Sequence, residues 1–110
     1  MNKFLLIVLF IVFSFVTVDA AIYKGQKVFR KKCLHCHSSA QAFIASHTAD
    51  EWKKLMGKDG SALAKLHLKT SKAKRSWQYF KSQKYTKSTK HLQQFLVEYA
   101  KDSGNVPACN

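Results

Sequence analysis

The stretch "GQKVFRKKCLHCH", residues 25–37, ends in two thiols and two imidazoles packed into five positions. On a helix, Cys33 and His37 lie one turn apart on the same face, with Cys36 close to it and His35 directed elsewhere. Three chemistries use such a set of side chains: a structural zinc site, a thiol redox pair, and covalent attachment of a haem.

Zinc and thiol redox chemistry each lack a part that they need. A structural zinc site has four ligands, usually as two pairs, and no second Cys-x-x-Cys or His-x₃-His pair follows in the chain. A thioredoxin-like dithiol belongs within a βαβ pattern, and alternation typical of strands is hard to find here. Cys-x-x-Cys-His, in contrast, is the attachment signature of c-type haem. It predicts thioether bonds from Cys33 and Cys36 and an iron bond from His37.

The first 20 residues have the layout of a secretory signal peptide. Lys3 precedes an almost unbroken apolar run over residues 4–18, which ends in the small-residue pattern Val18-Asp19-Ala20. The run is shorter than the roughly 20 apolar residues of a membrane-spanning helix. We expect cleavage after Ala20 and export to the periplasm, with an uncleaved N-terminal anchor as the alternative.

Cleavage would leave residues 21–110 as one small domain. A chain of this size buries little surface and commonly needs a metal, a cofactor or disulfides for stability. Three cysteines do not make a simple disulfide framework, because their number is odd. If a haem engages Cys33 and Cys36, Cys109 stands apart as a free thiol or an intermolecular disulfide.

The chain is strongly basic, with 19 Lys and Arg against 6 Asp and Glu and a formal net charge of +13. No acidic residue lies between Asp59 and Glu98, where nine basic residues occur: Lys65, Lys69, Lys72, Lys74, Arg75, Lys81, Lys84, Lys87 and Lys90. Such a surface attracts acidic proteins or anionic lipid headgroups, or serves only to keep the chain soluble. Export argues against nucleic acid as a partner.

Apolar residues at helical spacing predict an all-α domain. We expect four main helices, over residues 23–36, 48–56, 61–70 and 90–102. The second begins at a capping box, Thr48 followed by Glu51, and stops at Gly57. An aromatic cluster lies in or beside a short helical piece and consists of Trp77, Tyr79 and Phe80.

Around its Cys-x-x-Cys-His motif the chain resembles the class I c-type cytochromes. In that family a helix with a glycine and two apolar residues leads into the motif, as Gly25, Val28 and Phe29 do here. The closing helix carries an apolar-aromatic face, similar to Leu92, Phe95, Leu96 and Tyr99. The resemblance implies a small helical domain around one covalent haem c. It also implies that Gly25 lets the two helices cross closely and that Phe29 packs on Phe95 or Tyr99.

The methionine that binds the iron's distal side in that family has no counterpart, since no methionine follows Met56. The candidates for the distal ligand are His47, Met56, His67, His91 and Cys109. His67 is the first choice: it shares an apolar helix face with Leu63 and Leu66 and lies 30 residues after His37. A buried imidazole needs a partner, and iron is a suitable one.

Met56 is the second choice, with core packing beside Trp52 and Leu55 as its ordinary role. His47 suits a staple residue before the capping Thr48, and His91 is expected to flank the last helix. The remaining aromatic residues either line the haem and bind its propionates or pack in the core: Trp52, Trp77, Tyr79 and Tyr85.

The resemblance implies one-electron transfer rather than enzymatic catalysis. Two imidazole ligands would make a low-potential carrier, because a thioether ligand favours Fe(II). We expect a monomer whose lysine-rich surface meets an acidic redox partner, such as a membrane oxidase, reductase or peroxidase. An open or weakly held sixth site would instead suit a gas binder, a sensor or a peroxidase-like enzyme. A non-haem exported metal or thiol protein is a further alternative.

Overall fold

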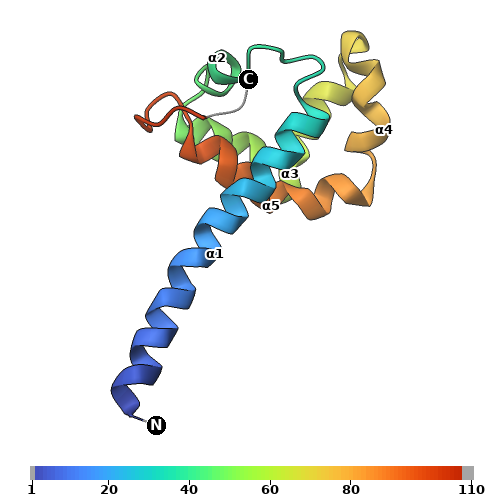
Figure 1. The fold of residues 1–110 in the computed structure, drawn as a ribbon. Coiled ribbons are helices and arrows are strands. Elements are labelled where there is room, and N and C mark those ends of the chain that lie inside the picture. The colour runs from blue at the N-terminus through green and yellow to red at the C-terminus, as the bar shows by residue number, and fades with distance from the viewer. Residues whose placement is uncertain (1, 108–110) are drawn as a thin grey trace.

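The computed structural model describes residues 2–107, with side-chain surroundings outside residues 4–18. The elements follow in the order α1 (Lys3–Lys32), α2 (Ala40–Ile44), α3 (Ala49–Leu68), the 3₁₀ helix η1 (Ser71–Ser76), α4 (Trp77–Phe80) and α5 (Gln83–Glu98). No strand occurs over these residues, so the predicted all-α class is confirmed. Figure 1 shows α1 as a long rod whose C-terminal half lies against the other helices.

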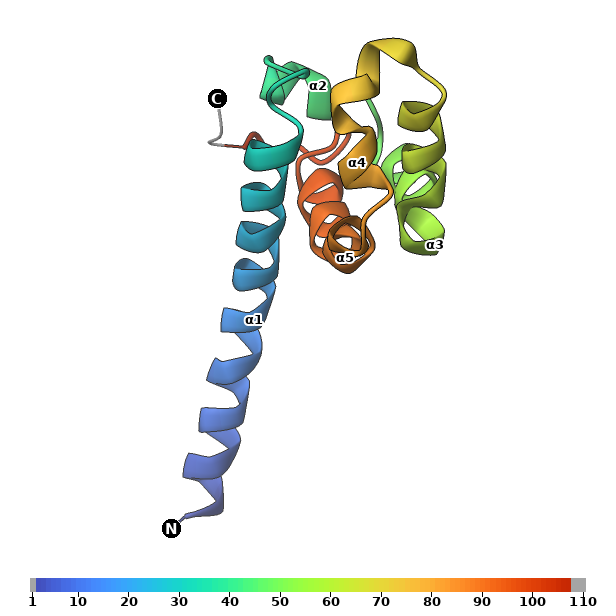
Figure 2. The same ribbon diagram turned by 90° about the vertical axis from the view of Figure 1, so that its right-hand side faces the viewer.

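The first helix is a single 30-residue element that passes through Ala20, the predicted cleavage point, without a break. Its N-terminal half extends away from the remaining helices (Figure 2). Among its described side chains, those that pack on the core begin at Ile22, beyond that point. Within the described residues, no helix has both the length and the apolar character needed to span a membrane.

Helix α1 crosses α5 at Gly25, as predicted. A Cβ atom at this position would overlap the carbonyl oxygen of His91 and come within 2.7 Å of Phe95 Cβ, so only glycine allows this approach. One turn later, the Phe29 and Phe95 rings pack with centroids 5.6 Å apart, and Tyr99 meets Phe95 edge to face at 5.2 Å. The predicted contact of Phe29 with the last helix is therefore confirmed.

Helix α3 contains a break that divides it into the two predicted helices. Residues 57–60 leave helical geometry, and three of them take left-handed conformations: Lys58, Asp59 and Gly60. The first half begins as expected, because the Thr48 hydroxyl accepts a hydrogen bond from the Glu51 N–H at 3.2 Å. His47 lies against Trp52 with ring centroids 4.7 Å apart, which confirms its staple position.

The last helix begins earlier than predicted. Helix α5 starts at Gln83 rather than residue 90, and the Ser82 hydroxyl accepts a hydrogen bond from the Tyr85 N–H at its start. Tyr85 and Thr89 continue the buried face of the later part into these first turns. They are less apolar than the leucines that follow them, so the periodicity did not reveal this segment.

The core lies where α1, α3 and α5 meet. Its fully buried large side chains are Phe29, Ile44, Trp52, Met56, Tyr85, Leu92, Phe95 and Leu96. The short helix α2 supplies Ile44 and Ala40, which the sequence analysis did not place in any element. Asp102 ties the end of the chain to α3, because its carboxylate accepts a hydrogen bond from the Ala49 N–H at 2.8 Å. Cys109 lies outside the described residues.

Candidate functional site

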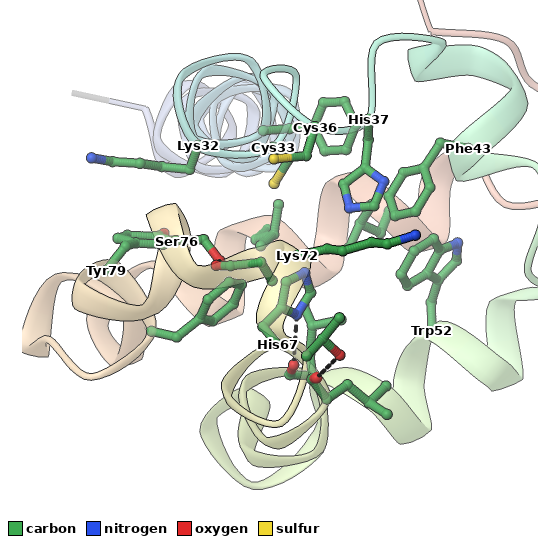
Figure 3. Close-up of a pocket in the computed structure, with 18 residues that line it drawn as sticks. Lys32, Cys33, Cys36, His37, Phe43, Trp52, His67, Lys72, Ser76 and Tyr79 are labelled. Atoms are coloured by element: carbon green, nitrogen blue, oxygen red, sulfur yellow. Dashed lines mark hydrogen bonds between the residues drawn. The ribbon is translucent and has the colours of Figure 1, made fainter.

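A largely apolar cavity of about 320 Å³ opens between the end of α1 and the wall formed by α3, η1 and α4 (Figure 3). The sequence-predicted residues Cys33, Cys36, His37 and His67 all line it. Its apolar wall consists of Phe29, Phe43, Trp52, Leu63, Leu66, Ala73, Phe80, Leu92 and Leu96. Its volume lies within the range of small-molecule and cofactor sites.

The Cys-x-x-Cys-His motif forms a turn directly after α1, which ends at Lys32 rather than at residue 36. The His37 N–H donates to the Cys33 carbonyl oxygen at 2.9 Å, so one helical turn still separates these residues. Figure 3 shows the two sulfur atoms side by side at the cavity edge, with the His37 imidazole directed inwards. The intervening His35 is exposed, as expected.

The Cys33 thiol and the His37 imidazole both favour their neutral forms. Burial, with a smaller contribution from neighbouring Cys36, raises the pKa of Cys33 to about 12. Burial, followed by the proximity of His67, lowers the pKa of His37. A neutral imidazole is the form that binds a metal ion.

His67 faces His37 from the opposite wall. Their ring centroids are 6.2 Å apart, and their planes are inclined at 82°. The Nδ1 atom of His67 lies 2.8 Å from the Leu63 carbonyl oxygen. A carbonyl oxygen only accepts, so Nδ1 carries the proton in the neutral ring and Nε2 keeps its lone pair. Metal-binding histidines commonly have this arrangement.

Aromatic rings fix the orientation of both histidines. Phe80 stacks on His67 with centroids 4.2 Å apart and planes inclined at 26°. Phe43 stacks on His37 at 3.8 Å and 20°. The Trp77 indole N–H donates to the His67 carbonyl oxygen at 2.7 Å, which fixes the end of α3 against α4. Each imidazole is thus stacked against an aromatic ring on one face.

The other distal candidates lie elsewhere. Met56 is buried in the core and does not line the cavity. His47 precedes α3, and its Nδ1–H donates to the Glu51 carboxylate at 2.8 Å on the exposed side of the protein. His91 lies beside Gln94 on α5, and its carbonyl group faces Gly25. The structure therefore brings His67 alone of the described candidates into the cavity with His37.

The polar groups of the four candidate aromatic residues already bind protein atoms. The Trp52 indole N–H donates to the Ile44 carbonyl oxygen at 2.9 Å. The Tyr85 hydroxyl donates to the Gly60 carbonyl oxygen at 2.6 Å. Tyr79 pairs with Ser88 at 2.9 Å. Trp52 and Tyr79 line the cavity, whereas Trp77 and Tyr85 do not. In the structure these four residues pack in the core or hold the cavity wall in place.

Two kinds of cavity residue were missed in the sequence analysis. Phe43 stands between Ala42 and Ile44 in the segment after the motif, where no helical or strand periodicity marks it as buried. Lys32 and Lys72 are the charged residues of the cavity lining, and Figure 3 shows Lys72 reaching across it. Among the described residues, no three His, Cys, Asp or Glu side chains are grouped to hold a metal ion by themselves.

No protein-family model matches this sequence, and the searches of curated proteins and of solved structures gave no significant match.

Proposed function

We propose that this protein is an exported monohaem c-type cytochrome that carries single electrons. The observation that carries the proposal is the placement of His37 and His67 across one cavity, beside Cys33 and Cys36. Two imidazoles bound to one metal ion from opposite sides would have ring centroids roughly 6.2 Å apart, since each metal–nitrogen bond is about 2.0 Å and each nitrogen lies about 1.1 Å from its ring centre. The separation of the two rings in the structure is 6.2 Å.

The residues of the cavity fit a haem in chemical character. Cys33 and Cys36 would form the thioether bonds, and His37 and His67 would bind the iron. The apolar wall, including Leu66 with 55 % of its surface exposed, would cover the macrocycle. Lys32 and Lys72 line the cavity and would supply positive charge to the two propionates of the haem. The close crossing of α1 and α5 at Gly25 agrees with the cytochrome c-like fold implied by the resemblance.

When bound, the haem would supply one-electron chemistry, with iron alternating between Fe(III) and Fe(II). The protein's part is to exclude water with the apolar wall and to hold both imidazoles in place. Two histidine ligands would give a low potential, and no residue acts as an acid or base. The surface lysines would attract an acidic redox partner and speed the encounter. A reduction rate that does not change with ionic strength would contradict the proposal of an acidic redox partner.

The export expected from residues 1–20 is part of the proposal. The described core contacts begin at Ile22, so removal of this segment would leave them intact. The mature protein would then work in the periplasm as a monomer.

The decisive experiment is expression in a bacterium that attaches c-type haem. We expect the purified protein to retain haem on a denaturing gel and to show a six-coordinate low-spin spectrum in both oxidation states. The Cys33→Ser/Cys36→Ser variant should lose the covalent stain, whereas His35→Ala, a change within the same turn, should keep it. Wild-type protein without haem, made by a host that loads a control cytochrome, would refute the proposal. Tight binding of carbon monoxide to reduced wild-type protein would favour an open-site gas binder or sensor instead.

A further inference from the structure

A second hollow lies next to the apolar cavity, between α1, α4 and α5. Its volume is about 210 Å³. Four of its seven lining residues are lysines, and the full set is Lys27, Val28, Lys31, Lys32, Tyr79, Lys84 and Ser88. We call this hollow the lysine groove. It owes its form to the Gly25 crossing, which brings the basic faces of two helices together.

The lysine groove concentrates positive charge without compensation from the protein. Its lining contains no carboxylate, and neither residues 20–49 nor residues 60–97 contain any acid. Within residues 2–107, the one contact between a basic and an acidic side chain joins His47 to Glu51, at the start of α3. Two of its ammonium groups lie over aromatic rings: Lys32 Nζ is 5.0 Å from the Tyr79 centroid, and Lys27 Nζ is 5.7 Å from the Tyr23 centroid. Like charges gathered in this way repel one another, and a bound anion would relieve that repulsion.

The hydroxyl groups of the lysine groove have their protons engaged. Ser88 donates to the Tyr85 carbonyl oxygen at 2.9 Å, so Tyr79 donates to the Ser88 oxygen in their 2.9 Å contact. Lysine ammonium groups are then the donors left for a ligand. The lining contains no arginine, whose planar fork matches carboxylates, whereas lysine binds phosphate as a point charge.

From these observations we infer that the lysine groove binds a small oligophosphate anion, with pyrophosphate as the simplest representative. The ligand must be compact, because the hollow is small, and it must carry several charges, because four lysines line the hollow. Lys32 and Tyr79 belong to both the lysine groove and the apolar cavity. The bound anion would therefore lie next to the proposed haem site.

Titration calorimetry with sodium pyrophosphate on the full purified protein tests this inference. We expect one site per chain, with affinity that falls as salt rises. Lys31→Ala/Lys84→Ala should weaken binding about tenfold, since each exposed ion pair contributes up to about 1 kcal/mol. The matched control is Lys24→Ala/Lys87→Ala, which removes the same charge from the same two helices outside the groove. Equal weakening by both pairs would show diffuse charge attraction and overturn the site.

Two further results distinguish pyrophosphate binding from membrane binding and from the proposed haem function. Binding to vesicles that contain anionic phospholipid, without saturable binding of pyrophosphate, would assign the lysines to membranes and refute the inference. Calorimetry does not depend on haem, so pyrophosphate binding by a chain without haem would support the lysine groove while the proposed function fails. Haem attachment without pyrophosphate binding would support the proposed function and refute the lysine groove as an anion site.

Discussion

The imidazoles of His37 and His67 face each other across the apolar cavity with centroids 6.2 Å apart and planes inclined at 82°. One belongs to the turn after α1 and the other to the last turns of α3, so the pair joins the two walls of the cavity. If the proposed haem is bound, the geometry of this pair would determine the coordination of its iron and its spectroscopic behaviour.

His67→Ala should convert the haem-loaded protein from low-spin to high-spin, because the structure places no other described distal candidate in the cavity. The reduced variant should bind carbon monoxide, and added imidazole should restore the low-spin optical spectrum. Met56→Leu is the control, since such a core substitution usually costs less than about 1.5 kcal/mol and leaves the cavity lining unchanged. A high-spin Met56→Leu protein together with a low-spin His67→Ala protein would reverse the ligand assignment.

Phe80 and Phe43 should control the angle between the ligand planes. The electron paramagnetic resonance spectrum of the oxidised protein depends on this angle, and we expect the highly anisotropic low-spin signal of nearly perpendicular imidazoles. Phe80→Leu removes the ring stacked on His67, so its signal should move towards that of less inclined planes. Tyr99→Leu is the matched control, because Tyr99 packs on Phe95. An unchanged signal in Phe80→Leu would show that the Leu63 hydrogen bond alone orients His67.

The sequence predicted those parts of the fold that follow from local chemistry. Thr48 and Glu51 mark a helix start because their spacing satisfies free N–H groups. Gly25 and Phe29 were recognised through the resemblance, and their contacts agree with it. The beginning of α5 was missed because Tyr85 and Thr89 are buried by tertiary packing that their local sequence does not announce.

The candidate site was predictable in its residue types and less so in its arrangement. The motif identified Cys33, Cys36 and His37, and helical spacing singled out His67. Neither reveals that His67 donates Nδ1–H to Leu63, because this depends on a side-chain rotamer. Phe43 lies within a segment that has no periodicity, so its stacking on His37 became visible only in three dimensions.

Gly25→Ala should destabilise the fold by about 1–3 kcal/mol, because the added methyl group has no room beside the His91 carbonyl and must push α1 and α5 apart. Urea unfolding followed by circular dichroism measures the change. Gly57→Ala provides the matched control, since a Cβ there meets nothing within 4 Å and its φ of −62° is ordinary. It should be neutral or stabilise the protein slightly. Equal stability of the two variants would contradict the close crossing.

Tyr85 should make the protein less stable in alkali. Burial raises the pKa of this phenol, with smaller contributions from Tyr79 and Cys33. The folded state therefore keeps the proton at a pH where the unfolded chain releases it. The contribution to stability is complete below about pH 10, the ordinary tyrosine value, and is lost as pH rises from there towards the raised folded pKa.

Tyr85→Phe should thus reduce the fall in unfolding free energy above pH 10. Part of the fall should remain, because burial also raises the pKa of Tyr79. At neutral pH the variant should have an unfolding free energy about 1 kcal/mol lower than the wild type, because the Gly60 carbonyl loses its 2.6 Å hydrogen bond. Urea unfolding at pH 7 and at several values above pH 10 measures both effects. Tyr23→Phe, at a side chain that is 58 % exposed, should match the wild type at each pH. If the Tyr85→Phe and wild-type curves stay parallel through the alkaline range, the buried phenol does not govern the alkaline loss.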